Sequence, residues 1–195
     1  MTTQRQRAAR IVLGLVATGA AAVVLTGLRQ HYAVLRTWEV VRALGWLASA
    51  CLIGALFVTP LQRVLRSPLL PALRRSLGLA ATSCGAVHAA AALLGLPGLA
   101  AAVLSDAWLR AGLAAFLLLV ALFITSFDAP LRRLRLQHWK ELHRLIYPAA
   151  LCVVLHALLG PYGTPALELT LAVCVALLLA LRICLALVSK TSPTE

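Results

Sequence analysis

The side chains in this sequence with the clearest capacity for chemistry are its histidines, because two of the five lie deep within long apolar stretches. These two are His88 and His156. An ionisable side chain inside a membrane span is energetically costly and usually faces the interior of a helix bundle, where it serves a function. Neutral imidazole is also an axial ligand of heme iron. The pair therefore predicts a b-type heme held between two helices.

The depth of the two histidines along their helices favours this pairing. His88 follows the start of its apolar run by about 12 residues, or roughly 18 Å, and His156 follows Leu142 by about 14 residues, or roughly 21 Å. Both spans are expected to run in the same direction, so the rings reach a similar depth toward the outer side. Iron with two imidazole ligands has no open position, which favours electron transfer over oxygen chemistry.

His143 begins the fifth apolar stretch, thirteen residues before the second of these histidines, which is about 20 Å along a helix. That spacing suits two stacked hemes, but thirteen helical steps turn the side chains about 140° apart unless Pro148 kinks the helix. The position thirteen residues before His88 is Arg75, preceded by Arg74. Arginines suit heme propionates or a phosphate-bearing cofactor. We therefore predict one heme on the buried pair, with His143, Arg74 and Arg75 serving a second heme or another inner cofactor.

The other two histidines and two of the tryptophans are interpreted as boundary residues. His31 and His138 occur in connections, where a solvated side chain is the expected state. Trp108 and Trp139 occur near helix ends, where indole rings commonly anchor a helix in the headgroup layer.

The composition identifies lipid as the solvent for most of the chain. Of 195 residues, 62% are hydrophobic and 12% are charged, and the mean hydropathy is +0.92. A soluble domain carries about 25% charged residues. The apolar runs are rich in Leu, Ala and Val without period-two alternation, which indicates helices and not a barrel. Five cysteines occur within apolar runs and form no CxxC, so they are expected to be small packing residues.

Six apolar stretches predict an all-α integral membrane protein, a six-helix transmembrane bundle that forms one domain from residue 11 to residue 188. The stretches are residues 11–28, 40–58, 76–96, 108–127, 145–159 and 165–188. Residues 1–10 and 189–195 are predicted to be short cytoplasmic ends. The first stretch is long for a signal peptide, so an uncleaved anchor is expected. No nucleotide-binding motif occurs in the sequence, so an electron donor and acceptor would be other molecules.

Lys and Arg residues predict the orientation of the bundle in a bacterial inner membrane. Basic residues precede the first stretch, fill the connection between the second and third, and recur between the fourth and fifth. Positively charged connections stay in the cytoplasm, so both termini are predicted to be cytoplasmic. The sixth stretch contains Glu168 and Arg182, which are expected to extend to a polar boundary.

Four short segments resemble the ferric reductase-like transmembrane family. They read Leu-Phe-Val-Thr-Pro-Leu-Gln-Arg at 56–63, Arg-Arg-Ser-Leu-Gly-Leu at 74–79, Phe-Ile-Thr-Ser at 123–126 and Trp-Lys-Glu-Leu-His-Arg-Leu-Ile-Tyr at 139–147. His88 follows the second segment and His156 follows the fourth, as part of the same resemblance. The resemblance covers roughly residues 52–159 and is strongest to heme-binding subunits of a bacterial methionine sulfoxide reductase system.

This resemblance implies a ferric reductase-like core at about residues 40–160 that holds heme b, with FMN as an associated cofactor. Electrons would come from the quinone pool or a cytoplasmic flavin reductase. They would pass to a periplasmic molybdopterin enzyme that reduces methionine sulfoxide in proteins. The histidines of the family correspond to His88, His143 and His156, whereas the chain departs at Arg75 from relatives with two histidines on each of two helices. Substrate chemistry is expected on the partner.

The sequence leaves other functions open. The chain could be another b-type cytochrome or ferric reductase-like subunit. It could also be a proton or solute transporter subunit without heme, in which buried histidines carry protons, or a scaffold in which they are dispensable.

Overall fold

The structure is a computed structural model that describes residues 33–126, 136–161 and 164–191, together with a few residues before residue 14. Within these ranges the regular structure is helical, and five helices are long and apolar enough to cross a membrane. They are Trp38–Leu65, Leu69–Gly95, Ala107–Ile124, Gln137–Leu159 and Pro165–Leu185. The protein is an all-helical membrane protein with these five candidate spans. The first predicted span, residues 11–28, lies almost entirely outside the described residues, so the sixth helix stays a prediction.

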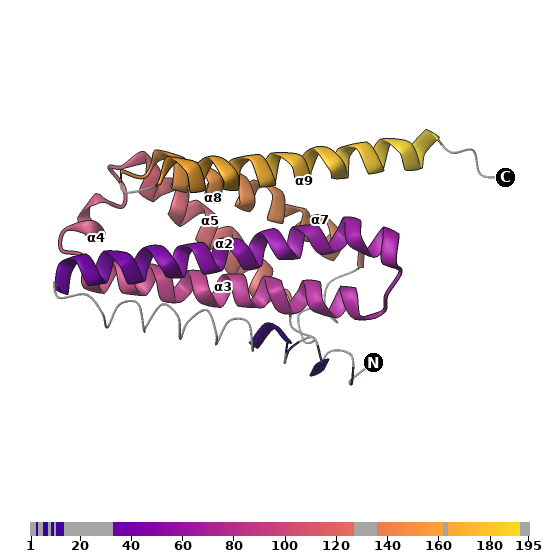
Figure 1. Cartoon of the computed structure of the whole chain (residues 1–195), viewed down its shortest axis with the longest axis horizontal. Helices are drawn as coiled ribbons and strands as arrows, with labels where there is room; N and C mark the ends of the chain where they lie inside the picture. Colours follow the sequence, from indigo (N-terminus) through magenta and orange to yellow (C-terminus); the bar gives the residue numbers. More distant parts are fainter. Residues whose placement is uncertain are drawn as a thin grey trace.

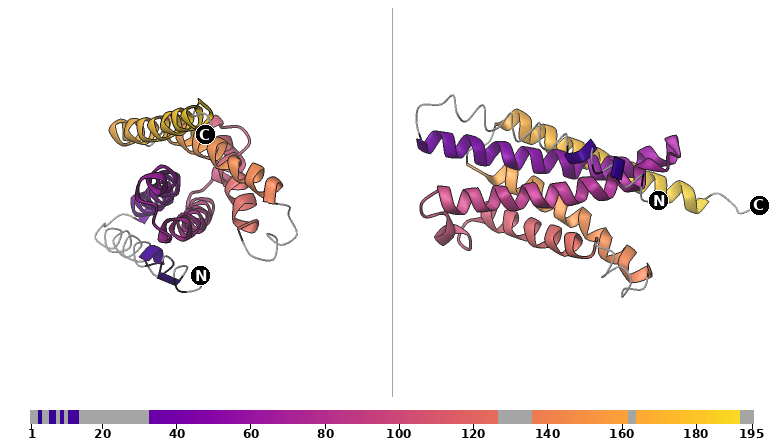
Figure 2. Two further views of the ribbon diagram at one scale, coloured as in Figure 1. Left: turned by 90° about the vertical axis from the view of Figure 1, so that its right-hand side faces the viewer. Right: turned by 90° about the horizontal axis from the view of Figure 1, so that it is seen from below.

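The helices form two antiparallel pairs and a fifth long helix that packs against both. The elements are α2 (Ala33–Leu65), α3 (Leu69–Gly95), α4 (Leu99–Ala102), α5 (Ala107–Ile124), α7 (Leu136–Leu142), η1 (His143–Leu145), α8 (Ile146–Leu159) and α9 (Pro165–Thr191). α2 pairs with α3 and α5 with α8, while α9 lies along α8 and α2 (Figures 1 and 2). α3 and α8 run in the same direction, as predicted for the helices that carry the two buried histidines (Figure 1).

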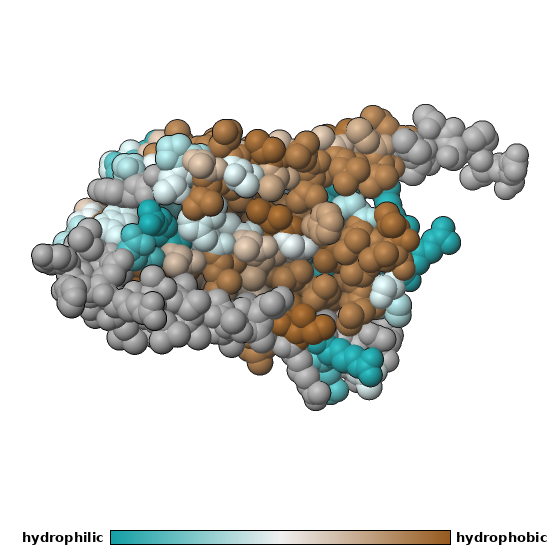
Figure 3. All heavy atoms as spheres, in the orientation of Figure 1, coloured by the Kyte–Doolittle hydropathy of each residue, from teal (hydrophilic) through white to brown (hydrophobic). Residues whose placement is uncertain are grey.

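The two ends of the bundle differ in their polar residues, and we name them for those residues. The histidine end contains the last turns of α3 and α8 with α4, at the left of Figure 1. The arginine end contains the turn between α2 and α3 together with α7, at the right. Between the ends, apolar side chains cover most of the face shown in Figure 3, with hydrophilic residues gathered toward both ends. That distribution is what a membrane-spanning bundle requires.

Small residues allow the helices to approach closely at the centre of the bundle. Ala81, Ala149 and Ala150 of α3 and α8 are each 0% exposed, and so is the larger Leu56 of α2, which packs in the same core. Since lipid tails are as apolar as these side chains, the helices associate through close packing and not through hydrophobic burial. All five cysteines have free thiols, and Cys51 and Cys84 are buried, which agrees with their predicted role as packing residues.

Helices α2 and α3 are longer than the apolar pattern predicted. The connection between them was predicted to hold four arginines, but it contains only Arg66 to Pro68. Arg63 lies in the last turn of α2, and Arg74 and Arg75 lie in the second turn of α3. Arginine is a good helix former, so a helix continues beyond the point where its apolar stretch ends.

A short 3₁₀ turn, η1, interrupts the fifth predicted helix at His143–Leu145. It stands directly before α8, in which Pro148 is the third residue. Proline has no N–H with which to bond the carbonyl of residue 144, so the regular α-helical pattern is not available there. The helix is therefore irregular at His143, next to the proline that the sequence identified as a site where the helix can kink, while a shared face for His143 and His156 stays a prediction.

Candidate functional site

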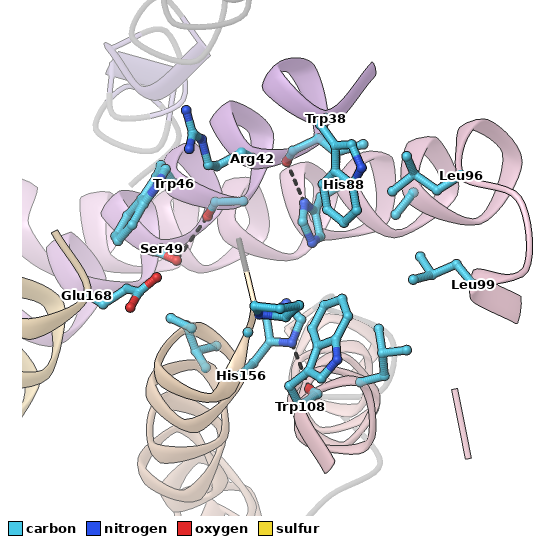
Figure 4. Close-up of a pocket in the computed structure, with 18 of the residues that line it drawn as sticks. Trp38, Arg42, Trp46, Ser49, His88, Leu96, Leu99, Trp108, His156 and Glu168 are labelled. Atoms are coloured by element: carbon cyan, nitrogen blue, oxygen red, sulfur yellow. Dashed lines mark hydrogen bonds between the residues drawn. The ribbon is translucent and has the colours of Figure 1, made fainter. Parts of the chain in front are cut away.

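The structure brings His88 of α3 and His156 of α8 together near the histidine end. Their ring centroids are 6.1 Å apart, and the ring planes are nearly perpendicular at 83°. Figure 4 shows both rings in the same cavity, with His88 directed toward His156. The similar depth predicted from counting residues along the two helices therefore corresponds to a direct juxtaposition.

Both rings are held by backbone carbonyl groups of other helices. His88 Nδ1 bonds the oxygen of Val41 on α2 at 2.7 Å, and His156 Nδ1 bonds the oxygen of Trp108 on α5 at 2.8 Å. A carbonyl oxygen only accepts hydrogen bonds, so in neutral imidazole the proton must be on Nδ1. The lone pair is then on Nε2 of each ring, which is the state of a histidine that binds a metal.

Two cavities adjoin the histidine pair. The tryptophan cavity is bordered by Trp38, Trp46, Trp108 and Glu168, and the apolar cavity by Leu113, Phe116 and Leu119. Both histidines line both cavities. The empty volumes are about 860 Å³ and 1120 Å³, including space that opens to the exterior. Cofactor sites have this character, with mostly apolar walls and a few polar groups.

These residues fit a heme with two histidine ligands. A metal ion bound by one nitrogen from each of two imidazoles lies about 2 Å from each nitrogen, which places the ring centroids about 6 Å apart. The observed 6.1 Å agrees with that separation. The two cavities provide space beside the rings for an apolar macrocycle. The described residues contain no group of three or more His, Cys, Asp and Glu side chains that could hold a metal ion, so the candidate site consists of the histidine pair.

Trp108, which its place near a helix end predicted to be an interfacial anchor, lies in the site. Its indole stacks on the His156 ring with centroids 5.4 Å apart and planes inclined by 23°. Its own carbonyl also accepts the His156 bond. Trp139 departs from the same interpretation, because its ring lies 4.1 Å from that of His143 and its Nε1 donates to the oxygen of Thr125 at 3.2 Å. Aromatic rings can anchor helices at an interface, but here each packs on an imidazole.

Two charged residues of α9, Glu168 and Arg182, were predicted to extend to a polar boundary. Glu168 is 9% exposed and lines the tryptophan cavity. Arg182 points into the bundle, where it donates to Tyr147 Oη at 2.7 Å and to the oxygen of Leu56 at 2.6 Å. Arg182 does not extend to a polar boundary as expected, because polar partners inside the bundle are closer.

Helix-face periodicity was the signal that could have identified the walls of the tryptophan cavity. Trp38, Arg42, Gly45 and Ser49 line it from α2. They recur every three or four residues, so they share one face of a helix. Arg42 also forms a salt bridge with Glu39 at 2.9 Å. The prediction of the site depended on histidines and therefore missed this face.

The second group of predicted site residues forms a separate cavity at the arginine end. His143, Arg74 and Arg75 line it together with Trp139 and Ser126, around an empty volume of about 1090 Å³ that includes open space. His143 Nδ1 bonds the oxygen of Trp139 at 3.1 Å, one turn earlier in its own segment. We call this the arginine cavity. Its residues line neither of the cavities beside His88 and His156, apart from Leu52 and Leu119, which also line the apolar cavity.

Of the remaining two histidines, only His138 lies within the described residues, and it lines none of these cavities. His138 is exposed on α7, as its predicted place in a connection implied. His31 lies outside the described residues.

Comparison with known proteins adds a family to this geometry. A family model described as "Ferric reductase like transmembrane component" matches residues 44–154, more than half of the 195 residues. The matched segment contains His88 and His143 and ends two residues before His156.

Several curated bacterial proteins are similar to this chain, each named "Protein-methionine-sulfoxide reductase heme-binding subunit MsrQ". The protein from Cronobacter sakazakii is 36% identical over 120 residues, covering 58% of this chain and 60% of that protein. The protein from Xanthomonas euvesicatoria pv. vesicatoria is 38% identical over 123 residues, covering 60% and 56%. The protein from Bordetella pertussis is 36% identical over 120 residues, covering 59% and 58%. The matched part of the chain thus spans less than two thirds of the length of each relative.

Proposed function

Because the chain belongs to the family of ferric reductase-like transmembrane components, as its sequence predicted, we propose that it is a heme-binding electron-transfer subunit of a bacterial inner membrane. The observation that carries this proposal is the pair of imidazoles, 6.1 Å apart. Each ring has its Nδ1 bonded to a backbone carbonyl, so each has Nε2 free to bind iron. Two histidines that carry protons in a transporter would need neither this distance between the rings nor a cavity beside them.

In this proposal His88 and His156 are the axial ligands of one heme b. When bound, the heme supplies an iron that accepts and releases one electron. With both histidines bound to it, the iron would have no open position for substrate. The walls of the site are mostly apolar, and the carbonyls of Val41 and Trp108 keep the rings in the ligand tautomer. The chain therefore relays electrons, and substrate chemistry takes place on a partner.

The relatives support a partner for this relay. Their names describe a heme-binding subunit of a protein-methionine-sulfoxide reductase. By similarity, the chain passes electrons to a periplasmic molybdopterin methionine sulfoxide reductase, MsrP, that repairs oxidised periplasmic proteins. The donor in this proposal is the quinone pool or a cytoplasmic flavin reductase.

We assign the second cofactor of the relay to the arginine cavity. Arg74 and Arg75 from α3 and His143 from η1 line one volume, and guanidinium groups bind phosphate or carboxylate oxygens by paired hydrogen bonds. The bound group is then an FMN phosphate or the propionates of a second heme. The ring of His143 packs on Trp139, and the residues that line this cavity include no second histidine to bind a heme iron together with it. This arrangement favours FMN over a second heme.

Heme content of the purified protein tests the proposal. The wild-type protein is expected to show a Soret band, a reducible b-type α band and one heme per chain by pyridine hemochrome. The His88→Ala and His156→Ala variants should lose the low-spin spectrum, and the double variant should lose heme altogether. His138→Ala is the matched control, because this histidine is exposed and lies outside the cavities, and it should bind heme like the wild type.

Replacement of His143 separates the two cavities. His143→Ala is expected to retain the full heme content, since His88 and His156 are intact. Loss of half the heme from a protein with two hemes per chain would instead assign a second heme to the arginine cavity. A colourless wild-type protein, or heme that survives loss of both His88 and His156, would contradict the proposed function.

A further inference from the structure

The two buried histidines are held in the same way by two different helices. His88 bonds the carbonyl of Val41 on α2, and four residues later α2 has Gly45. His156 bonds the carbonyl of Trp108 on α5, and four residues later α5 has Gly112. In an α-helix the carbonyl of one residue points toward the N–H of the residue four positions later. Each imidazole therefore approaches its helix at a carbonyl and at the glycine beside it.

The imidazole rings occupy the space that a side chain at either glycine would need. A Cβ added at Gly45 would lie 3.1 Å from both Cε1 and Nδ1 of His88. A Cβ added at Gly112 would lie 2.7 Å from Nδ1 and 2.9 Å from Cε1 of His156. Carbon contacts are normally about 3.5–4.0 Å. The ring edge can reach the carbonyl only because these positions lack a Cβ, so carbonyl and glycine act together as one unit.

We propose that these two units, which we call carbonyl–glycine cradles, are positioning elements that hold His88 and His156 in the tautomer and orientation required to bind heme. The inference rests on the proposed function and adds Gly45 and Gly112 to the residues that determine it. A carbonyl bonded to Nδ1 directs the lone pair of Nε2 away from the helix. Two cradles on separate helices fix the two ring planes independently, which accounts for their nearly perpendicular arrangement of 83°.

His143 lacks this arrangement, although its Nδ1 also bonds a backbone carbonyl. The acceptor is Trp139, one turn earlier in the same segment, and the face of the ring packs on the Trp139 indole at 4.1 Å. Gly78, which also lines the arginine cavity, has no atom within 4 Å of an added Cβ. The cradles therefore distinguish the histidine pair from the third candidate ligand.

Alanine substitution at the two glycines tests the inference in the full-length protein. A methyl group at Gly112 forces the His156 ring away from its carbonyl, and loss of such a supporting contact typically lowers metal affinity by about 10- to 100-fold. Gly112→Ala is expected to lower heme affinity by that factor. Gly45→Ala should have a smaller effect, because its contact distance of 3.1 Å is longer than the 2.7 Å at Gly112. Gly54→Ala is the matched control in α2, because a Cβ added there meets only the side chain of Leu77, at 3.3 Å, and Gly54 lines none of the three cavities, and it should bind heme like the wild type.

The readouts are heme per chain, the reduction potential and the low-spin EPR signal of the ferric protein, which reports the angle between the imidazole planes. Gly45→Ala is expected to retain heme with an altered EPR signal and potential. If the Gly112→Ala protein does not accumulate in the membrane, the Gly45→Ala variant alone tests the inference. If Gly45→Ala, or both variants, have the EPR signal, reduction potential and heme affinity of the wild type, the cradles do not position the histidines. The proposed function would then still stand. Absence of heme from the wild-type protein would instead overturn the proposed function, and the cradles with it.

Discussion

At the scale of single residues, Glu168 places a carboxylate in the wall of the cavity that contains the histidine pair. It lies in the first turn of α9, where a helix favours negative charge. Its side chain is 9% exposed, so solvent screens its charge less than it would at the surface. A negative charge near heme disfavours reduction, because reduction adds an electron to the group. Glu168 is therefore a determinant of the reduction potential in the proposed relay.

Glu168→Gln is expected to raise the midpoint potential of the heme by on the order of tens of millivolts, since it removes one partly buried charge and conserves shape. A redox titration followed at the α band measures the shift. Glu141→Gln is the control, because Glu141 is exposed on α7 at the arginine end. A potential that is unchanged or lowered in Glu168→Gln would argue against an electrostatic role for this residue.

At the scale of elements, α2, α8 and α9 are joined by one arginine. Pro60 lies inside α2 and has no N–H, so the carbonyl of Leu56 lacks its usual helical donor. Arg182 of α9 supplies the missing hydrogen bond at 2.6 Å and also donates to Tyr147 of α8 at 2.7 Å. Its guanidinium lies 5.3 Å from the centre of the Tyr147 ring as well. A proline in one helix thus explains why a charged side chain of another helix points inward.

Arg182→Met is expected to destabilise the protein by about 1.5–3 kcal/mol, the usual worth of a hydrogen bond to a charged group. The loss should be smaller in a Pro60→Ala background, where the backbone N–H of residue 60 can donate to Leu56. The apparent melting temperature in detergent measures both effects in a double-mutant cycle.

The control for that cycle is Arg63→Met. Arg63 is exposed and bonds the carbonyl of Leu185 at 3.1 Å, so its replacement should change stability little. Equal losses of stability from Arg182→Met in the wild-type and Pro60→Ala backgrounds would show that Arg182 does not act through the Leu56 carbonyl.

At the scale of the whole molecule, most basic residues of the described helices lie away from the histidine pair. Six basic residues lie at or near the arginine end in α2, α3, α7, η1 and the connecting turn, and they are Arg63, Arg66, Arg74, Arg75, Lys140 and Arg144. The histidine end has three, Arg36, Arg42 and Arg110, with acidic Glu39, Asp106 and Glu168. The positive-inside rule predicts that the arginine end faces the cytoplasm. That orientation would place the histidine pair in the periplasmic half, next to the proposed acceptor.

Reporter fusions test this orientation. Green fluorescent protein fused after Ser67 is expected to fluoresce, because it folds in the cytoplasm. Alkaline phosphatase fused after Ser105 should be active, because it requires the periplasm. Each reporter at the other position is the control and should be inactive. The opposite pattern would place the histidine pair in the cytoplasmic half and contradict the proposed direction of electron transfer.

The sequence by itself determined the elements and the depth of the candidate ligands. Long apolar runs predicted five of the described helices, because lipid-facing backbone must satisfy its hydrogen bonds within the segment. A fixed rise per residue then converted residue numbers into depth, which is why residue numbers alone were sufficient to pair His88 with His156. The resemblance to a family depended on short segments around the same residues.

Only the tertiary structure decided what each side chain meets at that depth. Rise per residue says nothing about how a helix is rotated about its axis or which neighbour it packs against, and both depend on contacts between residues distant in sequence. Packing between helices brings the carbonyls of Val41 and Trp108 within hydrogen-bonding distance of the two imidazoles. The same packing places Gly45 and Gly112 directly against the rings. For the same reason Arg182, predicted to extend outward, turned inward to a carbonyl that a proline in another helix had left without a donor.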